Sequence, residues 1–290
     1  MRLSFSQICG NIQSRMRIDS HHHLWKYDPK EYDWIDDSMK VIRSNFLPEN
    51  IHQEIKAVGI DGVVTVQARQ TVQETEWLLG MAAQNAFMRG VVGWVPLTDP
   101  KVADVLGSFK GKPKLKAVRH VVQGEPDPNY ILRDDFNHGI SALRQFGFVY
   151  DILILERQLP QSIKFVDKHP NQIFVLDHIA KPRIKENILS PWRENMLEIA
   201  KRPNVYCKIS GMVTEADYHL WTEKQLDPYF DVVLQAFEPK RLMFGSDWPV
   251  ALVAVNYGRW FKLVSKKIEK LSAPERDRIL GGTAVEAYKL

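Results

Sequence analysis

The sequence predicts an α/β fold, a (β/α)8 TIM barrel, from three observations. Eight short apolar runs rich in β-branched residues occur along the chain, and a helix-like segment follows each of them. The chain has 290 residues, and one such barrel typically needs about 250. No run is followed by the glycine pattern GxGxxG of a dinucleotide-binding sheet. A closed parallel barrel covered by helices is therefore favoured over an open doubly wound sheet.

The expected strands are nearly continuous apolar runs, as strands buried on both faces must be. They are centred on Ile18, Val63, Val91, Val118, Val149, Phe174, Tyr206 and Met243. The segments between them have apolar residues at helical spacing or a proline in the first turn. We expect helices at about 48–58, 71–86, 101–109, 134–145, 159–168, 192–201, 226–237 and 257–270, with 274–288 closing the chain.

Two segments fall outside this alternation. Residues 1–16 contain no apolar stretch long enough for a secretory signal, so we expect an N-terminal extension that is either disordered or precedes a translation start at Met16. Residues 17–290 then form a single barrel domain. Residues 25–47 form a long connection rich in tryptophan and tyrosine. Its aromatic content favours packing over the mouth of a pocket.

Composition excludes several classes of partner. The net charge of +4 is mild and spread along the chain, which argues against binding to nucleic acid. No apolar run approaches the roughly 20 residues that cross a bilayer. Cys9 and Cys207 are far apart and form no CxxC pair, which is consistent with a reducing, cytoplasmic location. The sequence leaves the choice between a monomer and a homo-oligomer open.

Three consecutive histidines, His21, His22 and His23, follow the first expected strand residue Ile18. Side chains alternate between the two faces of a strand, so His21 and His23 point the same way and His22 points towards the helix layer. Two imidazoles about 7 Å apart along one face can close on a single divalent ion. The pair therefore predicts a metal site, for which a solvated histidine cluster is the alternative.

Polar residues occur at the C-terminal ends of most expected strands, where the active site of such a barrel lies. In chain order they are His21 and His23, Gln67, Arg119 and His120, Tyr150 and Asp151, Asp177 and His178, Lys208 and Ser210, and Asp247. A structural role is open for some of them. Asp177 could cap a loop, Asp151 could point into the helix layer, and Lys208 could pair with a carboxylate.

Four motifs resemble one family. They are IDSHHHLW on the first strand, LDHIAKP on the sixth, CKISG on the seventh and FGSDWP on the eighth. Together with the ending GGTA…Y they resemble the amidohydrolase superfamily, over residues 17–290. The closest similarity is to its amidohydrolase-2 lactonase branch, which includes L-fuconolactonase, L-rhamnonolactonase and sulfomuconolactonase-like enzymes.

The resemblance implies roles for individual residues. His21 and His23 match the metal-binding pair, and Asp247 matches an aspartate that binds metal and handles the proton of the attacking water. His178 is expected to contact the carbonyl group or to bind metal. Trp25 and Arg119 match substrate-contacting positions. From their places at strand ends, we add Gln67, His120, Tyr150 and Lys208 as candidate substrate-binding residues.

The cofactor implied by the resemblance is one divalent ion, with zinc favoured. Many superfamily members carry a metal-binding lysine or histidine on the fifth strand, where this chain has Tyr150 and Asp151. That difference leaves one metal at most. Metal-free catalysis also stays open, because pyrone-dicarboxylate hydrolases of the same branch work without a metal.

The expected function is hydrolysis of a small sugar lactone, an aldono-1,4- or 1,5-lactone, in carbohydrate catabolism. A dicarboxylate lactone of the muconolactone or pyrone type is one alternative, although it would call for several arginines at the mouth. An aromatic-acid decarboxylase of the same superfamily is a second alternative. This chain lacks the fifth-strand histidine that such decarboxylases use. A barrel that only binds ligand is the third.

Overall fold

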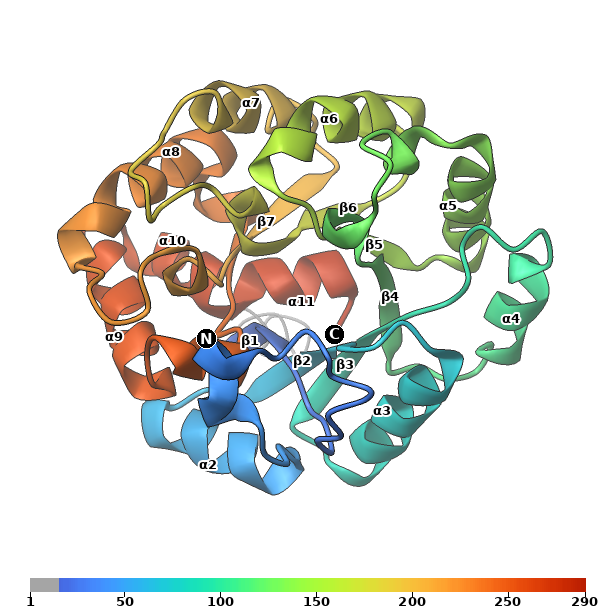
Figure 1. Ribbon diagram of the computed structural model, residues 1–290, viewed down its shortest axis with the longest axis horizontal. Coiled ribbons are helices and arrows are strands. Elements are labelled where there is room, and N and C mark those ends of the chain that lie inside the picture. The colour runs from blue at the N-terminus through green and yellow to red at the C-terminus, as the bar shows by residue number, and fades with distance from the viewer. Residues whose placement is uncertain (1–15) are drawn as a thin grey trace, which may run out of the picture.

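The structure is a computed structural model that describes residues 16–290. Eight parallel strands form one sheet in chain order, with each strand hydrogen-bonded to the next (Figure 1). Their bounds are β1 (Ile18–His22), β2 (Gly62–Val66), β3 (Met88–Gly93), β4 (Leu115–His120), β5 (Val149–Ile152), β6 (Phe174–Leu176), β7 (Val205–Ile209) and β8 (Leu242–Phe244). The predicted barrel is confirmed. Apart from Met16, the expected N-terminal extension lies outside the described residues.

Helices follow the strands at the predicted places. They are α2 (Pro48–Val58), α3 (Val72–Gln84), α4 (Val102–Ser108), α5 (Asp134–Phe146), α6 (Leu159–Lys168), α7 (Trp192–Ile199), α8 (Glu223–Arg241), α9 (Tyr257–Lys267), α10 (Ala273–Asp277) and α11 (Thr283–Tyr288). Helix α8 starts earlier than expected because the Thr222 side chain accepts a hydrogen bond from the Gln225 amide and caps it. No helix among residues 16–290 is long and apolar enough to cross a membrane.

The barrel closes where β1 meets the segment that follows β8. The Asp247 amide donates to the His21 carbonyl oxygen at 2.8 Å, and the His23 amide donates to the Trp248 carbonyl oxygen at 2.7 Å. The buried Asp19 carboxylate reinforces this seam by accepting hydrogen bonds from the Ser246 amide and the Tyr257 hydroxyl. Three of the four residues that make these closing backbone bonds are therefore ones that the sequence marks as metal ligands.

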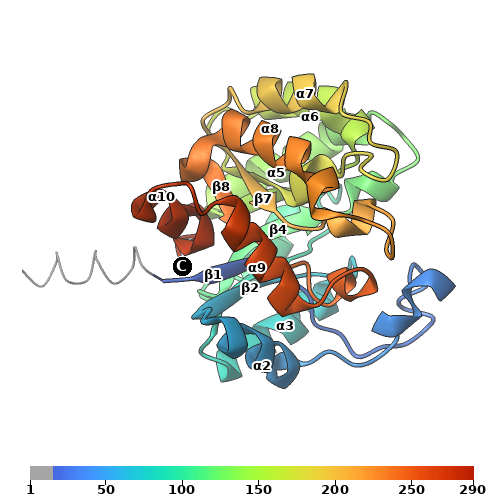
Figure 2. The same cartoon turned by 90° about the vertical axis from the view of Figure 1, so that its left-hand side faces the viewer.

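The two ends of the barrel are covered differently. Helix α11 lies across the N-terminal end (Figure 1), and its Tyr288 packs with Ile18, Val64 and Val92 inside the barrel. The segment of residues 25–47 lies at the opposite, C-terminal end (Figure 2). It contains a short 3-10 helix, η1 (Asp37–Ile42).

The aromatic connection packs at the mouth, as its composition predicts. Trp25, Tyr32, Ile35 and Ile42 are buried together against Val253, which belongs to the loop after β8. Antiparallel backbone bonds between Trp25 and Phe46 close the base of the segment. The aromatic side chains therefore anchor this segment beside the strand ends.

We predict that Gly139→Ala destabilises the protein. Gly139 is buried in α5, and an added Cβ would lie 2.2 Å from the Leu97 carbonyl oxygen. Because that oxygen is backbone, the helix must shift, at a cost of about 1–3 kcal/mol. Thermal unfolding of Gly80→Ala provides the control, since Gly80 is exposed in α3 and its Cβ would meet nothing within 4 Å. The control should gain stability; a Gly139→Ala protein as stable as the wild type would contradict this packing.

Candidate active site

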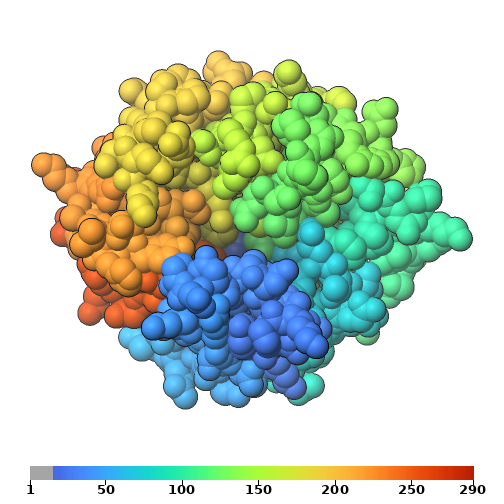
Figure 3. Space-filling view, viewed as in Figure 1, coloured from blue at the N-terminus to red at the C-terminus, as the bar shows by residue number. Residues whose placement is uncertain are grey.

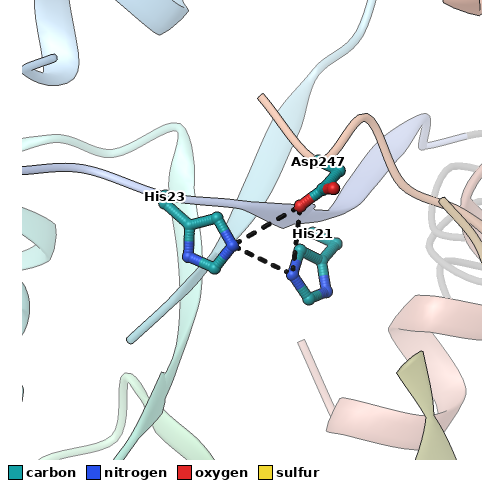
Figure 4. Close-up of side chains that lie close together, drawn as sticks. All are labelled: His21, His23 and Asp247. Carbon is teal, nitrogen blue, oxygen red and sulfur yellow. Dashed lines mark hydrogen bonds and ion pairs between the residues drawn. The ribbon is translucent and has the colours of Figure 1, made fainter. Parts of the chain in front are cut away.

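Three side chains converge at the barrel seam. The Nε2 atoms of His21 and His23 lie 3.2 Å apart, and the Asp247 Oδ1 atom lies 3.8 Å from the first and 3.5 Å from the second (Figure 4). His22, between the two histidines, instead bonds through Nε2 to the Thr65 hydroxyl at 2.8 Å. The strand alternation predicted from the three histidines is therefore what the structure has.

This triangle fits a divalent ion. Two unprotonated imidazole nitrogens repel each other at 3.2 Å unless a proton or a cation lies between them. Three ligands of a tetrahedral zinc ion with bonds of about 2.0–2.1 Å lie roughly 3.3 Å apart. The edges of the triangle, from 3.2 to 3.8 Å, are close to that spacing. His21, His23 and Asp247 thus have both the donor types and the spacing that a zinc-like ion requires.

Neighbouring groups orient the two imidazoles. His23 Nδ1 lies 2.9 Å from the Val66 carbonyl oxygen, which can only accept a hydrogen bond. The ring proton of neutral His23 is therefore on Nδ1, and the lone pair of Nε2 is available to bind a metal ion. His21 Nδ1 lies 3.4 Å from Asp177 Oδ1 and 3.2 Å from Lys208 Nζ. The arrangement at His23 is typical of a metal-binding histidine.

The ionisation states also suit metal binding. Burial lowers the pKa of His21 well below its ordinary value, so its imidazole is neutral at pH 7. Burial alone would raise the pKa of Asp247, but the nearby His178 and His23 outweigh it and hold that pKa below its usual value. The site therefore presents a neutral His21 imidazole and an ionised Asp247 carboxylate.

His178 reaches the site from a strained turn. It begins a run of four residues with left-handed backbone, with φ values of 51°, 48°, 59° and 48° for residues 178–181. Such conformations cost of order 1–3 kcal/mol each and concentrate at functional sites. The turn places His178 Nδ1 2.9 Å from the Ser210 hydroxyl and Nε2 3.9 Å from Asp247 Oδ1. Gly211 makes room, because a Cβ there would lie 2.5 Å from the ring.

A buried ion network lies directly below the triangle. Lys208 Nζ contacts Asp151 Oδ2 at 2.6 Å and Asp177 Oδ1 at 2.9 Å, and the Arg119 guanidinium contacts Asp177 Oδ2 at 3.0 Å. The Tyr288 hydroxyl of α11 donates to Asp151 Oδ2 at 2.7 Å. Two cations and two carboxylates therefore balance one another in the barrel interior.

Strand β5 directs Asp151 into the barrel and Tyr150, the predicted substrate contact, to the other face. Asp151 points into the barrel, where Lys208 and Tyr288 bind it. Tyr150 is fully buried on the other face, with its ring 5.9 Å from those of Phe136 and Phe165. Both faces of this four-residue strand are buried, so burial could not distinguish them from sequence. Tyr150 cannot contact a ligand at the mouth.

Three other predicted substrate contacts are also fully buried. The Trp25 indole nitrogen donates to the Ser44 carbonyl oxygen and its ring packs under the 25–47 segment. Gln67 is bonded to Arg119 and to the Arg69 carbonyl oxygen. Lys208 is held by its two carboxylates, as the alternative for it proposed. The hydrogen bonds and ion pairs of these side chains are made to other groups of the protein around the site.

Arg119 and His120 lie on opposite faces of β4. Each nitrogen of the Arg119 guanidinium is already bonded, to Gln67 or to Asp177. His120 faces away from the triangle, stacked on Tyr130 with ring centres 5.1 Å apart. Its nitrogens are bonded to the Trp94 indole and the Glu125 carboxylate. Arg119 Nη1 also lies 3.5 Å from His21 Nε2, so Arg119 adjoins the triangle directly, whereas His120 does not.

Loop residues line a hollow on the same face of the barrel as the triangle, and neither the triangle's residues nor His178 are among those that line it. A hollow of 770 Å³ opens on the C-terminal face of the barrel (Figure 3), and Glu156, Arg157, Lys181, Glu215 and Tyr218 are among the residues that line it. They follow β5, β6 and β7, and the sequence analysis missed all of them. Lys181 lies within the LDHIAKP motif, and this was the one sign in the sequence that it could belong to the site. The other lining residues lie in irregular loops, which have no periodic pattern that could identify them.

With this geometry in place, comparison with known proteins identifies the family. The family model described as Amidohydrolase matches residues 18–290, which is nearly the whole chain. The chain belongs to the amidohydrolase family. The resemblance that the sequence motifs suggested is thereby confirmed.

Several relatives of this amidohydrolase carry lactonase names. An L-fucono-1,5-lactonase of Burkholderia multivorans is 40% identical over 95% of this chain and 96% of its own length. A second L-fucono-1,5-lactonase, from Burkholderia ambifaria, is 31% identical over 94% of this chain and 96% of its own. An L-rhamnono-gamma-lactonase of Scheffersomyces stipitis is 26% identical over 61% of this chain and 59% of its own.

Solved structures agree with this assignment. A crystal structure of an amidohydrolase from Burkholderia multivorans with bound zinc has a TM-score of 0.92 and 40% identity, over 95% of this chain and 99% of that one. A 2-pyrone-4,6-dicarboxylic acid hydrolase from Pseudomonas putida, described in its structure as putative, has a TM-score of 0.77 and 18% identity, over 95% and 98% of the two chains. At that identity the second similarity establishes the fold alone.

We predict that the double variant His21→Asn/His23→Asn loses a bound divalent ion that the wild type retains. Removing two nitrogen ligands leaves Asp247 as the remaining member of the triangle. The measurement is metal content by mass spectrometry after incubation with zinc and dialysis. His22→Gln is the matched control, because His22 is adjacent but bonds to Thr65. Equal metal content in the double variant and the control would contradict the site.

We also predict that Lys208→Met lowers the free energy of unfolding by about 3–5 kcal/mol, because it leaves the buried Asp151 carboxylate without its cation and Asp177 with Arg119 alone. Chemical denaturation measures this. Lys185→Met removes an exposed ammonium that faces Asp217 at 3.6 Å and should change stability little. A Lys208→Met protein of wild-type stability with weakened substrate binding would restore the original substrate-binding role.

Proposed function

We propose that this amidohydrolase hydrolyses a small sugar lactone, with L-fucono-1,5-lactone as the leading candidate, to the open-chain aldonic acid. The observation that carries the proposal is the triangle of His21, His23 and Asp247 at the mouth of the barrel, with His178 beside it. The 40% identity of the chain to an L-fucono-1,5-lactonase supports it. A role in carbohydrate catabolism and a cytoplasmic location belong to the same proposal.

The shape and charge of the hollow support a neutral, hydroxylated substrate. Its volume of 770 Å³ is within the range of small-molecule pockets. Four basic and four acidic side chains line it, so it has no excess of positive charge to attract a dicarboxylate. The dicarboxylate-lactone alternative is therefore less favoured. Aromatic-acid decarboxylases share only the fold with this chain, at 12% and 13% identity.

The metal in this proposal is one zinc ion held by His21, His23 and Asp247. Support comes from the fit of the triangle and from the similar Burkholderia multivorans structure with bound zinc. Such an ion would lower the pKa of a bound water towards about 7 and polarise the ester carbonyl. The remaining chemistry falls to the side chains.

Asp247 provides the base. Its ionised carboxylate accepts the proton of the attacking water and then delivers it to the ring oxygen as the carbon–oxygen bond of the lactone breaks. The backbone amide of Asp247 is hydrogen-bonded to the His21 carbonyl oxygen, and this bond holds the Asp247 carboxylate in the triangle. The proton therefore has to move only between atoms that contact this one carboxylate.

His178 stabilises the negative charge that develops on the carbonyl oxygen. Burial lowers its pKa to about 4, so the ring is neutral at pH 7. When the Ser210 hydroxyl donates to Nδ1, the ring proton resides on Nε2, which faces Asp247 and the substrate. A neutral donor fixed in this way can bind an oxyanion without first having to reorganise.

We predict that Asp247→Asn lowers kcat for lactone hydrolysis at least about 100-fold, because the amide cannot accept the proton of water. Hydrolysis is followed by acid release in a pH-indicator assay on a panel of sugar lactones. Circular dichroism and thermal unfolding verify that the variant is folded. An Asp247→Asn enzyme with most of its activity would exclude this role. Carbon dioxide release from an aromatic acid by the wild type would support the decarboxylase instead.

A further inference from the structure

Two ion pairs line the hollow at different depths. Lys181 Nζ and Glu215 Oε1 lie 3.3 Å apart, and their side chains are only 19% and 22% exposed. Arg183 Nε and Glu186 Oε2 lie 3.8 Å apart, with side chains 51% and 48% exposed. The first pair is thus part of the inner wall, and the second belongs to the outer rim.

The backbone ties the inner pair to the residues of the active site. The Lys181 amide donates to the His178 carbonyl oxygen at 2.8 Å and ends the left-handed turn that positions that histidine. Glu215 ends a short 3-10 helix, η6 (Val213–Glu215), which is anchored to the Gly211 carbonyl oxygen by the Thr214 hydroxyl. Gly211 itself contacts the His178 ring. Both members of the pair therefore reach the hollow from segments that also hold His178.

Charge–charge interactions link this pair to Asp247. Burial raises the pKa of the Glu215 carboxyl group; Lys181 opposes the rise and the Asp247 carboxylate adds to it. The Lys181 ammonium in turn helps to lower the pKa of Asp247. The pair therefore acts electrostatically on Asp247 from the wall of the hollow.

A mostly buried carboxylate beside an ammonium can recognise hydroxyl groups. The carboxylate has two acceptor oxygens, one of which contacts Lys181, and the ammonium has three N–H donors. Hydrogen bonds to charged groups are about twice as strong as those between neutral groups. Such a pair can therefore both accept from and donate to neighbouring hydroxyls, and a plain hydrocarbon ring offers it nothing in return.

We propose that Lys181 and Glu215 determine specificity for the hydroxylated side of the lactone ring. Glu215 accepts hydrogen bonds from ring hydroxyls, and Lys181 donates to one of them. This inference rests on the proposed lactonase function. It assigns to Lys181 and Glu215 the recognition of the ring hydroxyls, whereas other groups act on the ester.

The test compares two lactones of the same ring size. L-fucono-1,5-lactone carries ring hydroxyls and δ-valerolactone carries none. Glu215→Gln and Lys181→Met should each lower kcat/KM for the hydroxylated lactone at least about tenfold more than for the plain one, because the lost hydrogen bonds exist only with the first. Glu186→Gln, from the rim pair, is the matched control and should leave the ratio of the two kcat/KM values unchanged.

The outcomes separate the two proposals. Equal losses on both lactones would assign Glu215 and Lys181 to structure or chemistry and overturn the specificity role. No loss on either would place recognition of the hydroxyls elsewhere and would overturn it as well. Wild-type enzyme that opens neither lactone would contradict the lactonase function itself, before any variant is compared.

Discussion

The seam that closes the barrel is the constraint on which the active site depends. Backbone bonds from Asp247 to His21 and from His23 to Trp248 join the last strand segment to the first. The same residues project the three side chains of the triangle, so barrel closure itself brings together ligands that are more than 220 positions apart in the sequence. A barrel that failed to close would have neither a complete sheet nor a site. Stability and function therefore share one set of hydrogen bonds.

Beneath the seam, two buried carboxylates already have cationic partners within the protein. Asp151 and Asp177 are the carboxylates that could serve a second ion, and Lys208 and Arg119 already neutralise them. Their burial makes each charge depend on its partner, because an unpaired ion in the interior is very costly. Tyr288, from the helix that covers the far end of the barrel, also binds Asp151. Below the triangle, the barrel interior thus contains the side-chain cations Lys208 and Arg119 in place of a second ion.

The fold and the four side chains that converge at the seam could be predicted from the sequence, but the walls of the pocket could not. Strand and helix positions follow from periodic burial, and His21, His23, His178 and Asp247 follow from the rule that strand ends form the mouth of a barrel. The orientation of Tyr150 and Asp151 could not be deduced in this way, because both faces of β5 are buried and strand pairing decides which points inwards. Lys181 and Glu215 depend on irregular loops, including a left-handed turn that no periodic pattern encodes.

The most direct measurement is a titration of metal-stripped enzyme with zinc during hydrolysis of L-fucono-1,5-lactone. The triangle above a pair of carboxylates already neutralised by Lys208 and Arg119 predicts that the rate rises in proportion to added zinc and levels off at one ion per chain. A rate that continued to rise until two ions were bound per chain would contradict the claim that Lys208 and Arg119 take the place of a second metal ion. Full activity in the stripped enzyme would contradict the metal site at the seam.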